Sequence, residues 1–151
     1  MWDHGWPELI SVKQPAVGAT AARKIPGETY EGVLVARATL VTSAAVANRF
    51  PALELLDGDG SVIFRVTDPT AVPAGTTRTV SWVRDIGITQ TSGAGFDLMP
   101  FSSIVFPPGF QLRWNVDAMD VGDQLSAIKL YVHRIPSAQW APSTGSTPYE
   151  S

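Results

Sequence analysis

Apolar and polar residues alternate along much of the chain between residues 30 and 134. The alternation is clearest in three segments, which span residues 32–42, 110–117 and 124–134. A period of two predicts strands with one buried face and one exposed face. The residues predicted to point inward are Leu34, Ala36, Ala38 and Leu40 in the first segment, Phe110, Leu112, Trp114 and Val116 in the second, and Ile128, Leu130 and Val132 in the third.

Shorter apolar segments separated by turn residues lie between these three. Strands are predicted at residues 53–56, 62–66, 77–85 and 104–106, and connections at residues 43–52, 67–76, 91–95 and 118–123. The Asp-Gly-Asp-Gly sequence at residues 57–60 predicts a hairpin, and Pro107-Pro108-Gly109 predicts a turn. No segment has the helical period over three turns. About eight short strands predict an all-β fold: a single β-sandwich, with a jelly roll as the leading form.

The two ends of the chain lack this alternation. We therefore predict an extended N-terminal arm at residues 1–29, a β-sandwich core at residues 30–135, and a short flexible tail rich in Pro, Ser and Thr at residues 136–151. Large aromatic residues on an arm are typical of a contact surface; the alternative is that they pack on their own domain. The predicted interaction residues are Trp2, Trp6, Pro7, Lys13, Arg23, Lys24, Pro26 and Trp140.

The composition argues against several classes of function. The chain has 11 Lys and Arg against 14 Asp and Glu, so its net charge is −3, and neither half is basic. It lacks the positive footprint of a nucleic-acid-binding protein, so we expect no nucleic acid partner. The absence of Cys excludes disulfides, thiolate nucleophiles and cysteine-ligated metals. No apolar run is long enough for a membrane span, and no secretory signal is visible, so we expect synthesis in the cytoplasm and no membrane partner.

No catalytic or cofactor-binding constellation stands out in the sequence. His133 is predicted on the outer face of the last strand, and no G-x-S-x-G sequence supports a triad around it. The acidic residues with a spacing that a cation could use are Asp57 and Asp59, and Asp117, Asp120 and Asp123. Neither group matches an EF-hand, and the turn-forming role of Asp and Gly is the simpler interpretation of both. We predict no enzyme activity and no cofactor, and cation binding at these residues stays open.

Four short motifs occur in an order that resembles small structural proteins of tailed bacteriophages. They are Ala47-Asn48-Arg49 before a short strand, the turn Asp57-Gly58-Asp59-Gly60, Pro107-Pro108-Gly109 before an alternating strand, and Gly122-Asp123-Gln124 before the last strand. The resemblance spans residues 34–134 and covers neither the predicted arm nor the predicted tail.

The resemblance implies a virion component, and within that class a capsid decoration or cement protein. Such proteins are often homotrimers that bind the outer surface of the head and staple neighbouring subunits of the major capsid protein. In this chain, the resemblance implies that Trp2, Trp6 and the segment up to Pro26 lie across capsid subunits. Two other classes stay open. One is a tail-fibre or baseplate domain that binds a host glycan through exposed aromatics such as Tyr131, and the other is a head–tail connector subunit.

Overall fold

All regular elements in the described part of the chain are strands, as the alternating pattern predicts. The computed structural model describes residues 5–85, 90–92, 95–102 and 104–136, and only the backbone of residues 90–92. The strands are β1 (Trp6–Ser11), β2 (Ala21–Lys24), β3 (Thr29–Val41), β4 (Phe50–Leu56), β5 (Val62–Thr67), β6 (Thr77–Arg84), β7 (Gln90–Ser92), β8 (Phe96–Phe101), β9 (Val105–Phe106), β10 (Gln111–Asp117) and β11 (Gln124–Pro136). Within these residues no helix is long and apolar enough to cross a membrane.

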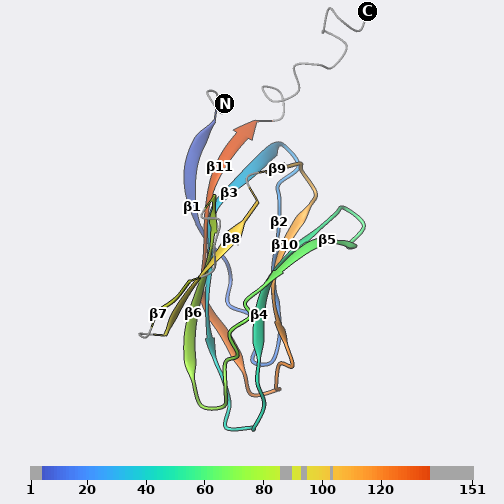
Figure 1. The fold of residues 1–151 in the computed structure, drawn as a ribbon. Helices are drawn as coiled ribbons and strands as arrows, with labels where there is room; N and C mark the ends of the chain where they lie inside the picture. The colour runs from blue at the N-terminus through green and yellow to red at the C-terminus, as the bar shows by residue number, and fades with distance from the viewer. Residues whose placement is uncertain (1–4, 86–89, 93–94, 103, 137–151) are drawn as a thin grey trace, which may run out of the picture.

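The strands form two sheets that pack face to face (Figure 1). The larger sheet has the order β1-β11-β3-β6-β8-β7, with β9 paired to β3, and the smaller has the order β2-β10-β4-β5. If the inserted strands β7, β8 and β9 are set aside, the remaining strands can be renumbered from 1 to 8 along the chain. Their order is then 1-8-3-6 in the larger sheet and 2-7-4-5 in the smaller sheet. This is the double Greek key of a jelly roll. The predicted β-sandwich and its jelly-roll form are therefore confirmed.

The first two strands of the jelly roll come from the segment predicted as an arm. β1 pairs with β11 along its whole length, and β2 pairs with β10. The prediction that residues 1–29 form an extended arm outside a core beginning at residue 30 is therefore wrong for β1 and β2. Their alternation is hidden because β1 is a largely exposed edge strand, and β2 has four residues of which Ala21 is buried. Pro136, predicted as the first residue of the tail, is instead the last residue of β11, where it pairs with Thr29. Residues 1–4 and the rest of the predicted tail, residues 137–151, lie outside the described residues.

A bulge in β3 changes which residues face the core near the start of this strand. The pairing of β3 with β11 shifts by one residue at Leu34. Val33 consequently takes the buried position, and Leu34 is half-buried instead of fully buried as predicted. Beyond the bulge, the predicted inward residues Ala36, Ala38 and Leu40 are buried.

The core lies between the sheets and is built from the faces that the alternation predicts. Trp82 in β6 and Trp114 in β10 are the two largest fully buried side chains. The indole nitrogen of Trp82 donates a hydrogen bond to the carbonyl oxygen of Val66, at 3.0 Å, and so joins the two sheets. The other predicted inward residues that are buried are Val80, Leu112, Val116, Ile128, Leu130 and Val132.

The inserted strands β7 and β8 do not follow from the sequence pattern, which predicts a loop at residues 91–95. β8 pairs in parallel with β6, and its buried side chains are Asp97, Met99 and Phe101. A buried Asp and the proline at position 100 interrupt the apolar alternation, so the sequence does not reveal this strand. The insertion widens the larger sheet beyond β6, where the smaller sheet has no strand in the described residues.

Candidate interaction surfaces

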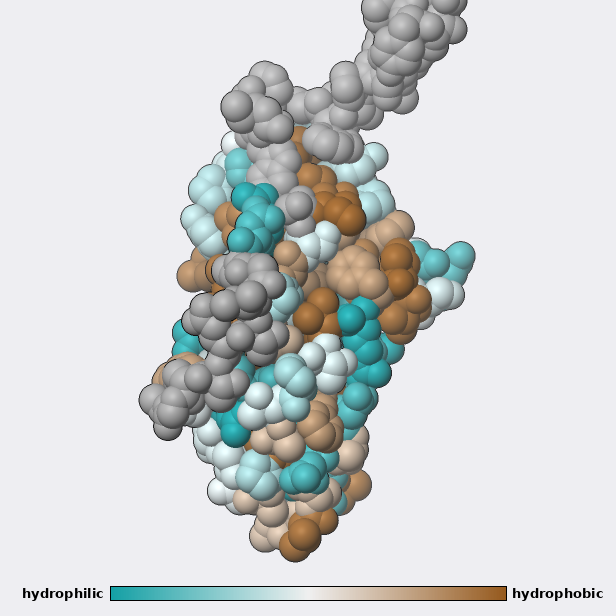
Figure 2. All heavy atoms as spheres, viewed as in Figure 1, coloured by the Kyte–Doolittle hydropathy of each residue, from teal (hydrophilic) through white to brown (hydrophobic). Residues whose placement is uncertain are grey.

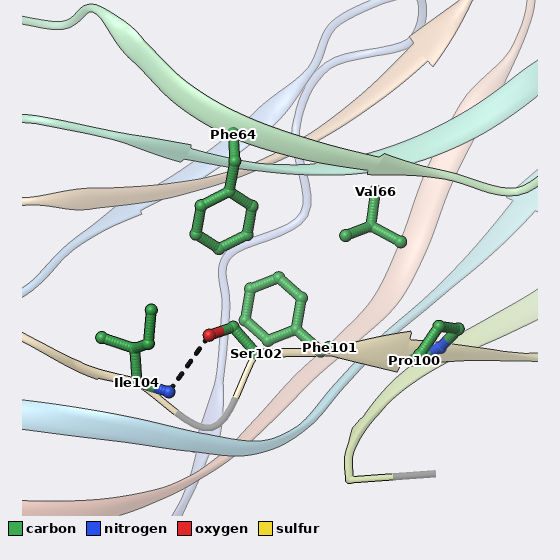
Figure 3. Close-up of a pocket in the computed structure, with 6 residues that line it drawn as sticks. All are labelled: Phe64, Val66, Pro100, Phe101, Ser102 and Ile104. Atoms are coloured by element: carbon green, nitrogen blue, oxygen red, sulfur yellow. Dashed lines mark hydrogen bonds between the residues drawn. The ribbon is translucent and has the colours of Figure 1, made fainter. Parts of the chain in front are cut away.

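An apolar groove lies at the edge of the sandwich where the two sheets end unevenly. It has a volume of about 310 Å³ and lies between β5 of the smaller sheet and the end of β8 in the larger sheet (Figure 3). Two of its aromatic rings, those of Phe64 and Phe101, have centroids 5.5 Å apart. The lining residues are Phe64, Val66, Pro100, Phe101, Ser102 and Ile104. Ser102 is the one polar side chain of this lining, and its hydroxyl accepts a hydrogen bond from the Ile104 backbone nitrogen at 3.1 Å. The groove therefore suits an apolar group.

The strand beside the groove, β5, is the last strand of the smaller sheet. It pairs with β4 on one side, and no strand of the described residues pairs with its other side. Its residues Val62 and Ile63 are 47% and 50% exposed. Figure 2 shows apolar side chains gathered on this face, between β5 and β8. Since a free strand edge offers backbone donors and acceptors to another extended chain, the edge and the groove together form a site for an extended apolar segment.

A second hollow lies on the outer face of the larger sheet, across β1, β11 and β3. It has a volume of about 370 Å³ and is lined by Leu9, Val35, Arg37, Lys129 and Tyr131. Leu9 pairs in register with Tyr131, and Tyr131 with Val35, so these side chains form one row across three strands. Leu9 is 66% exposed and Tyr131 is 39% exposed. This surface, which we call the outer-face hollow, therefore combines an apolar row with two cations.

Two acidic residues that could have held a cation are instead used in contacts between loops. The buried Asp123 carboxylate pairs with the equally buried guanidinium of Arg49, with Nε 2.9 Å from Oδ2. The hydroxyl of Ser43 donates to Asp120 at 2.7 Å, and this bond holds the pKa of Asp120 below 3.8. Burial works to raise the pKa of Asp123, but the hydrogen bonds from Arg49, Ser43 and Asp120 outweigh it and the pKa is lowered. Both carboxylates therefore stay ionised as structural links.

Of the remaining acidic candidates, Asp57 and Asp117 also have structural contacts. The Asp57 carboxylate accepts hydrogen bonds from the backbone nitrogens of Asp59, at 2.9 Å, and Ser61, at 3.0 Å. These bonds close the turn between β4 and β5, so the hairpin predicted at this Asp-Gly sequence is confirmed. Asp117 pairs with Arg65. In the part of the chain that the structure describes, no group of three His, Cys, Asp or Glu could hold a metal ion.

The residues predicted for interaction at the start of the chain are partly on the surface. Trp6 and Pro7 are exposed on the edge strand β1, with Trp6 43% exposed. Lys13 is exposed in the connection between β1 and β2. Trp2 and Trp140 lie outside the described residues.

The other predicted interaction residues lie around β2. Arg23 forms an ion pair with the buried Glu31, which also receives Arg134 at 3.2 Å. This network ties β2 to β3 and β11. Lys24 and Pro26 line a hollow of about 470 Å³ near the turn that follows β2. The six predicted interaction residues that the structure describes are thus dispersed, and none of these six lines the groove between β5 and β8, which sequence reasoning missed.

No protein-family model matches the chain, and no curated protein matches it. Among solved structures, the chain is similar to part of a protein of the T13 IBDV viral particle, with 14% identity and a TM-score of 0.40, over 90% of this chain and 32% of that chain. It is also similar to dimeric latent PorU from Porphyromonas gingivalis, with 15% identity and a TM-score of 0.44, over 88% of this chain and 13% of that chain. A chain of infectious bursal disease virus Gt strain matches with 12% identity and a TM-score of 0.33, over 91% of this chain and 32% of that chain. The chain spans about a third or less of these proteins, and similarity at this level does not identify a function.

Proposed function

We propose that this chain is a structural protein of a virus particle: a decoration or cement protein on the outer surface of the head of a tailed bacteriophage. In this role it binds the major capsid protein and staples neighbouring subunits. The observation that carries the proposal is the free edge of β5 beside an apolar groove, since together they fit an extended segment of another protein. Jelly rolls serve both as viral capsid domains and as lectins, so the fold supports this proposal without deciding it.

The groove favours a protein partner over a glycan. Sugars present many hydroxyls, whose burial costs free energy unless each finds a hydrogen-bond partner. The groove offers one polar side chain, Ser102, and this single hydroxyl cannot satisfy the several hydroxyls of a sugar. A tail-fibre or baseplate domain that binds a glycan is therefore the weaker alternative. A head–tail connector subunit would also use protein contacts, and its position in the particle separates it from a decoration protein.

The contacts in this proposal differ from those of an extended arm. Because β1 and β2 belong to the sandwich, the described residues near the N-terminus that are free to touch capsid subunits are exposed ones such as Trp6 and Pro7. The proposal keeps a homotrimer as the expected assembly. It assigns the chain no nucleic acid or membrane partner, no cofactor and no catalytic role.

The test is binding of the full chain to shells assembled from the major capsid protein of the same phage, measured by co-sedimentation. We expect saturable binding by the unchanged chain, and binding weaker by about tenfold or more for Ile104→Asp, because a partner would bury the new carboxylate without a counter-ion. Ile104 is 59% exposed, so the variant should fold with an unchanged Tm. Val46→Asp is the matched control, because it adds the same charge at a side chain that is 97% exposed in the loop between β3 and β4.

The outcomes separate the proposed role from the proposed site. If Ile104→Asp and Val46→Asp both bind like the unchanged chain, the groove is not the docking site. If the unchanged chain does not bind the shells, the decoration role is wrong. Cryo-EM of purified virions then decides the position: density at the tail or the portal vertex, and not on the outer head surface, would assign the chain to a fibre or a connector.

A further inference from the structure

The outer-face hollow is positively charged on a chain that is acidic overall. Two rows of paired residues cross it, and they are Leu9–Tyr131–Val35 and Ser11–Lys129–Arg37. Neither row contains Asp or Glu. The Lys129 ammonium donates to the Ser11 hydroxyl at 2.8 Å, and neither Lys129 nor Arg37 has a carboxylate partner within the described residues. The hollow therefore offers two unneutralised cations beside an apolar row.

The tip of the β4–β5 hairpin has the opposite charge. It carries Asp57 and the exposed Asp59, and the half-exposed Val62 and Ile63 follow after Gly60 and Ser61. In the part of the chain that is described, neither carboxylate pairs with a cation. The hairpin projects from the smaller sheet, on the opposite side of the molecule from the outer face of the larger sheet (Figure 1). One copy thus presents acids with aliphatic side chains on one side, and cations with an apolar row on the other.

We propose that copies of this chain associate head to tail, with the tip of the β4–β5 hairpin of one copy seated in the outer-face hollow of the next. The two carboxylates of the tip face the two cations of the hollow, and the exposed aliphatic side chains of the hairpin cover the apolar row. Charge complementarity selects this occupant, since opposite charges across an interface fix its register and exclude like-charged surfaces.

The two contacting surfaces differ, so the interface is heterologous. A heterologous interface closes into a ring or extends into a filament, whereas a two-fold dimer needs one surface that meets itself. The hairpin tip and the outer-face hollow are both distinct from the residues that line the groove between β5 and β8. The inference deepens the self-association that the proposed function expects, and it shares Val62 and Ile63 with the edge of β5. It does not depend on binding to capsid shells, and Ile104→Asp, which lies outside both surfaces, should associate like the unchanged chain.

The test is the mass of the full chain in solution, measured by sedimentation velocity over a range of protein concentrations. We expect assemblies larger than a monomer that weaken as salt rises from roughly 0.05 to 0.5 M, because salt screens exposed charges. Asp59→Lys and Lys129→Glu should each raise the dissociation constant about tenfold or more. The matched control is Glu28→Lys, which makes the same charge change as Asp59→Lys at an exposed position outside both surfaces and should leave the mass unchanged.

The decisive variant combines Asp59→Lys with Lys129→Glu in one chain. Since each head-to-tail contact then again joins opposite charges, association should return. Single variants that keep the mass of the unchanged chain would contradict the pairing of these two surfaces, and so would a double variant that stays dissociated. An unchanged chain that is monomeric at low salt would overturn self-association, and binding of an acidic protein or a carboxylated glycan by that monomer would assign the outer-face hollow to another occupant.

Discussion

Replacing Asp68 with Asn should remove a pH dependence from the stability of the fold. Asp68 follows β5 and Asp97 lies in β8, and both side chains are buried. One oxygen of each carboxyl is satisfied: the Thr70 backbone nitrogen donates to Asp68 at 2.9 Å, and Arg78 donates to Asp97 at 3.0 Å. Oδ2 of Asp68 and Oδ1 of Asp97 have no further partner among the described residues. One proton held between the two carboxyls would satisfy both of these oxygens.

The size of the effect follows from the pKa of Asp68. Burial raises this pKa, and the hydrogen bond to Asp97 raises it further, from 3.8 to about 7. At about 1.4 kcal/mol per unit, a shift of about three units corresponds to about 4 kcal/mol. Because structural relaxation and water penetration reduce the cost of a buried charge, we expect about half of this, ~2 kcal/mol. The folded state has the higher pKa, so this stabilisation is fully present below the unfolded-state value of 3.8 and is lost as the pH rises through about 7.

Urea unfolding at about pH 5 and about pH 8 measures this loss as a change in the free energy of unfolding. The free energy of unfolding of the unchanged protein should fall by about 1.5 kcal/mol from about pH 5 to about pH 8, because the Asp68–Asp97 pair loses its shared proton. Asp68→Asn should lose much less, because the Asn amide can donate to Oδ1 of Asp97 at both pH values. Asp59→Asn is the matched control, since it neutralises an exposed carboxylate. Equal pH dependence in Asp68→Asn and the unchanged protein would refute a shared proton at this pair.

Two further predictions concern the contacts that hold the sandwich together. Arg49→Ala leaves the buried Asp123 carboxylate without its counter-ion and should lower the free energy of unfolding by about 3–5 kcal/mol. Urea unfolding measures this change, and an unchanged free energy would contradict the structural role of the pair. Deleting residues 1–29 removes one strand from each sheet, so the truncated chain should lose its cooperative unfolding transition and the dispersion of its amide NMR spectrum. A truncated chain that still folds would show that the sandwich does not need β1 and β2.

Strands with one face in the core and one face exposed could be predicted from the sequence. β10 is the clearest case, because Leu112 and Trp114 point into the core from a strand that has neighbours on both sides. β4 is harder, because it is buried on both faces and has no alternation. Its Glu54 is covered by Arg113, at 2.6 Å, and by Arg65, at 3.5 Å. A strand that is covered by ion pairs on its outer face does not have the pattern of a half-buried strand.

The groove could not be predicted, because its lining comes from strands whose pairing is not visible in the sequence. Phe64 and Phe101 are far apart along the chain, and they meet because β8 pairs in parallel with β6. Arg23 illustrates the same difficulty for a single residue. Its charge suggests a surface contact, but the charge does not reveal that Glu31 is buried beside it. The exposure of Trp6 follows from the position of β1 at the edge of the larger sheet.

The unequal widths of the two sheets explain why the groove exists and what would fill it. β5 faces β6 across the core, where the Trp82 indole bonds to the Val66 carbonyl. β8 continues the larger sheet beyond β6, past the last strand of the smaller sheet. One strand added to the free edge of β5 would therefore lie opposite β8 and cover the groove. To match β5, which has 6 residues, it would need a similar length with an apolar side chain at every second position. The geometry thus defines the partner segment by its extended conformation and its alternating apolar side chains. A contact of this kind at the edge of β5 depends on backbone hydrogen bonds and apolar burial, whereas the contact proposed for the outer-face hollow depends on charge.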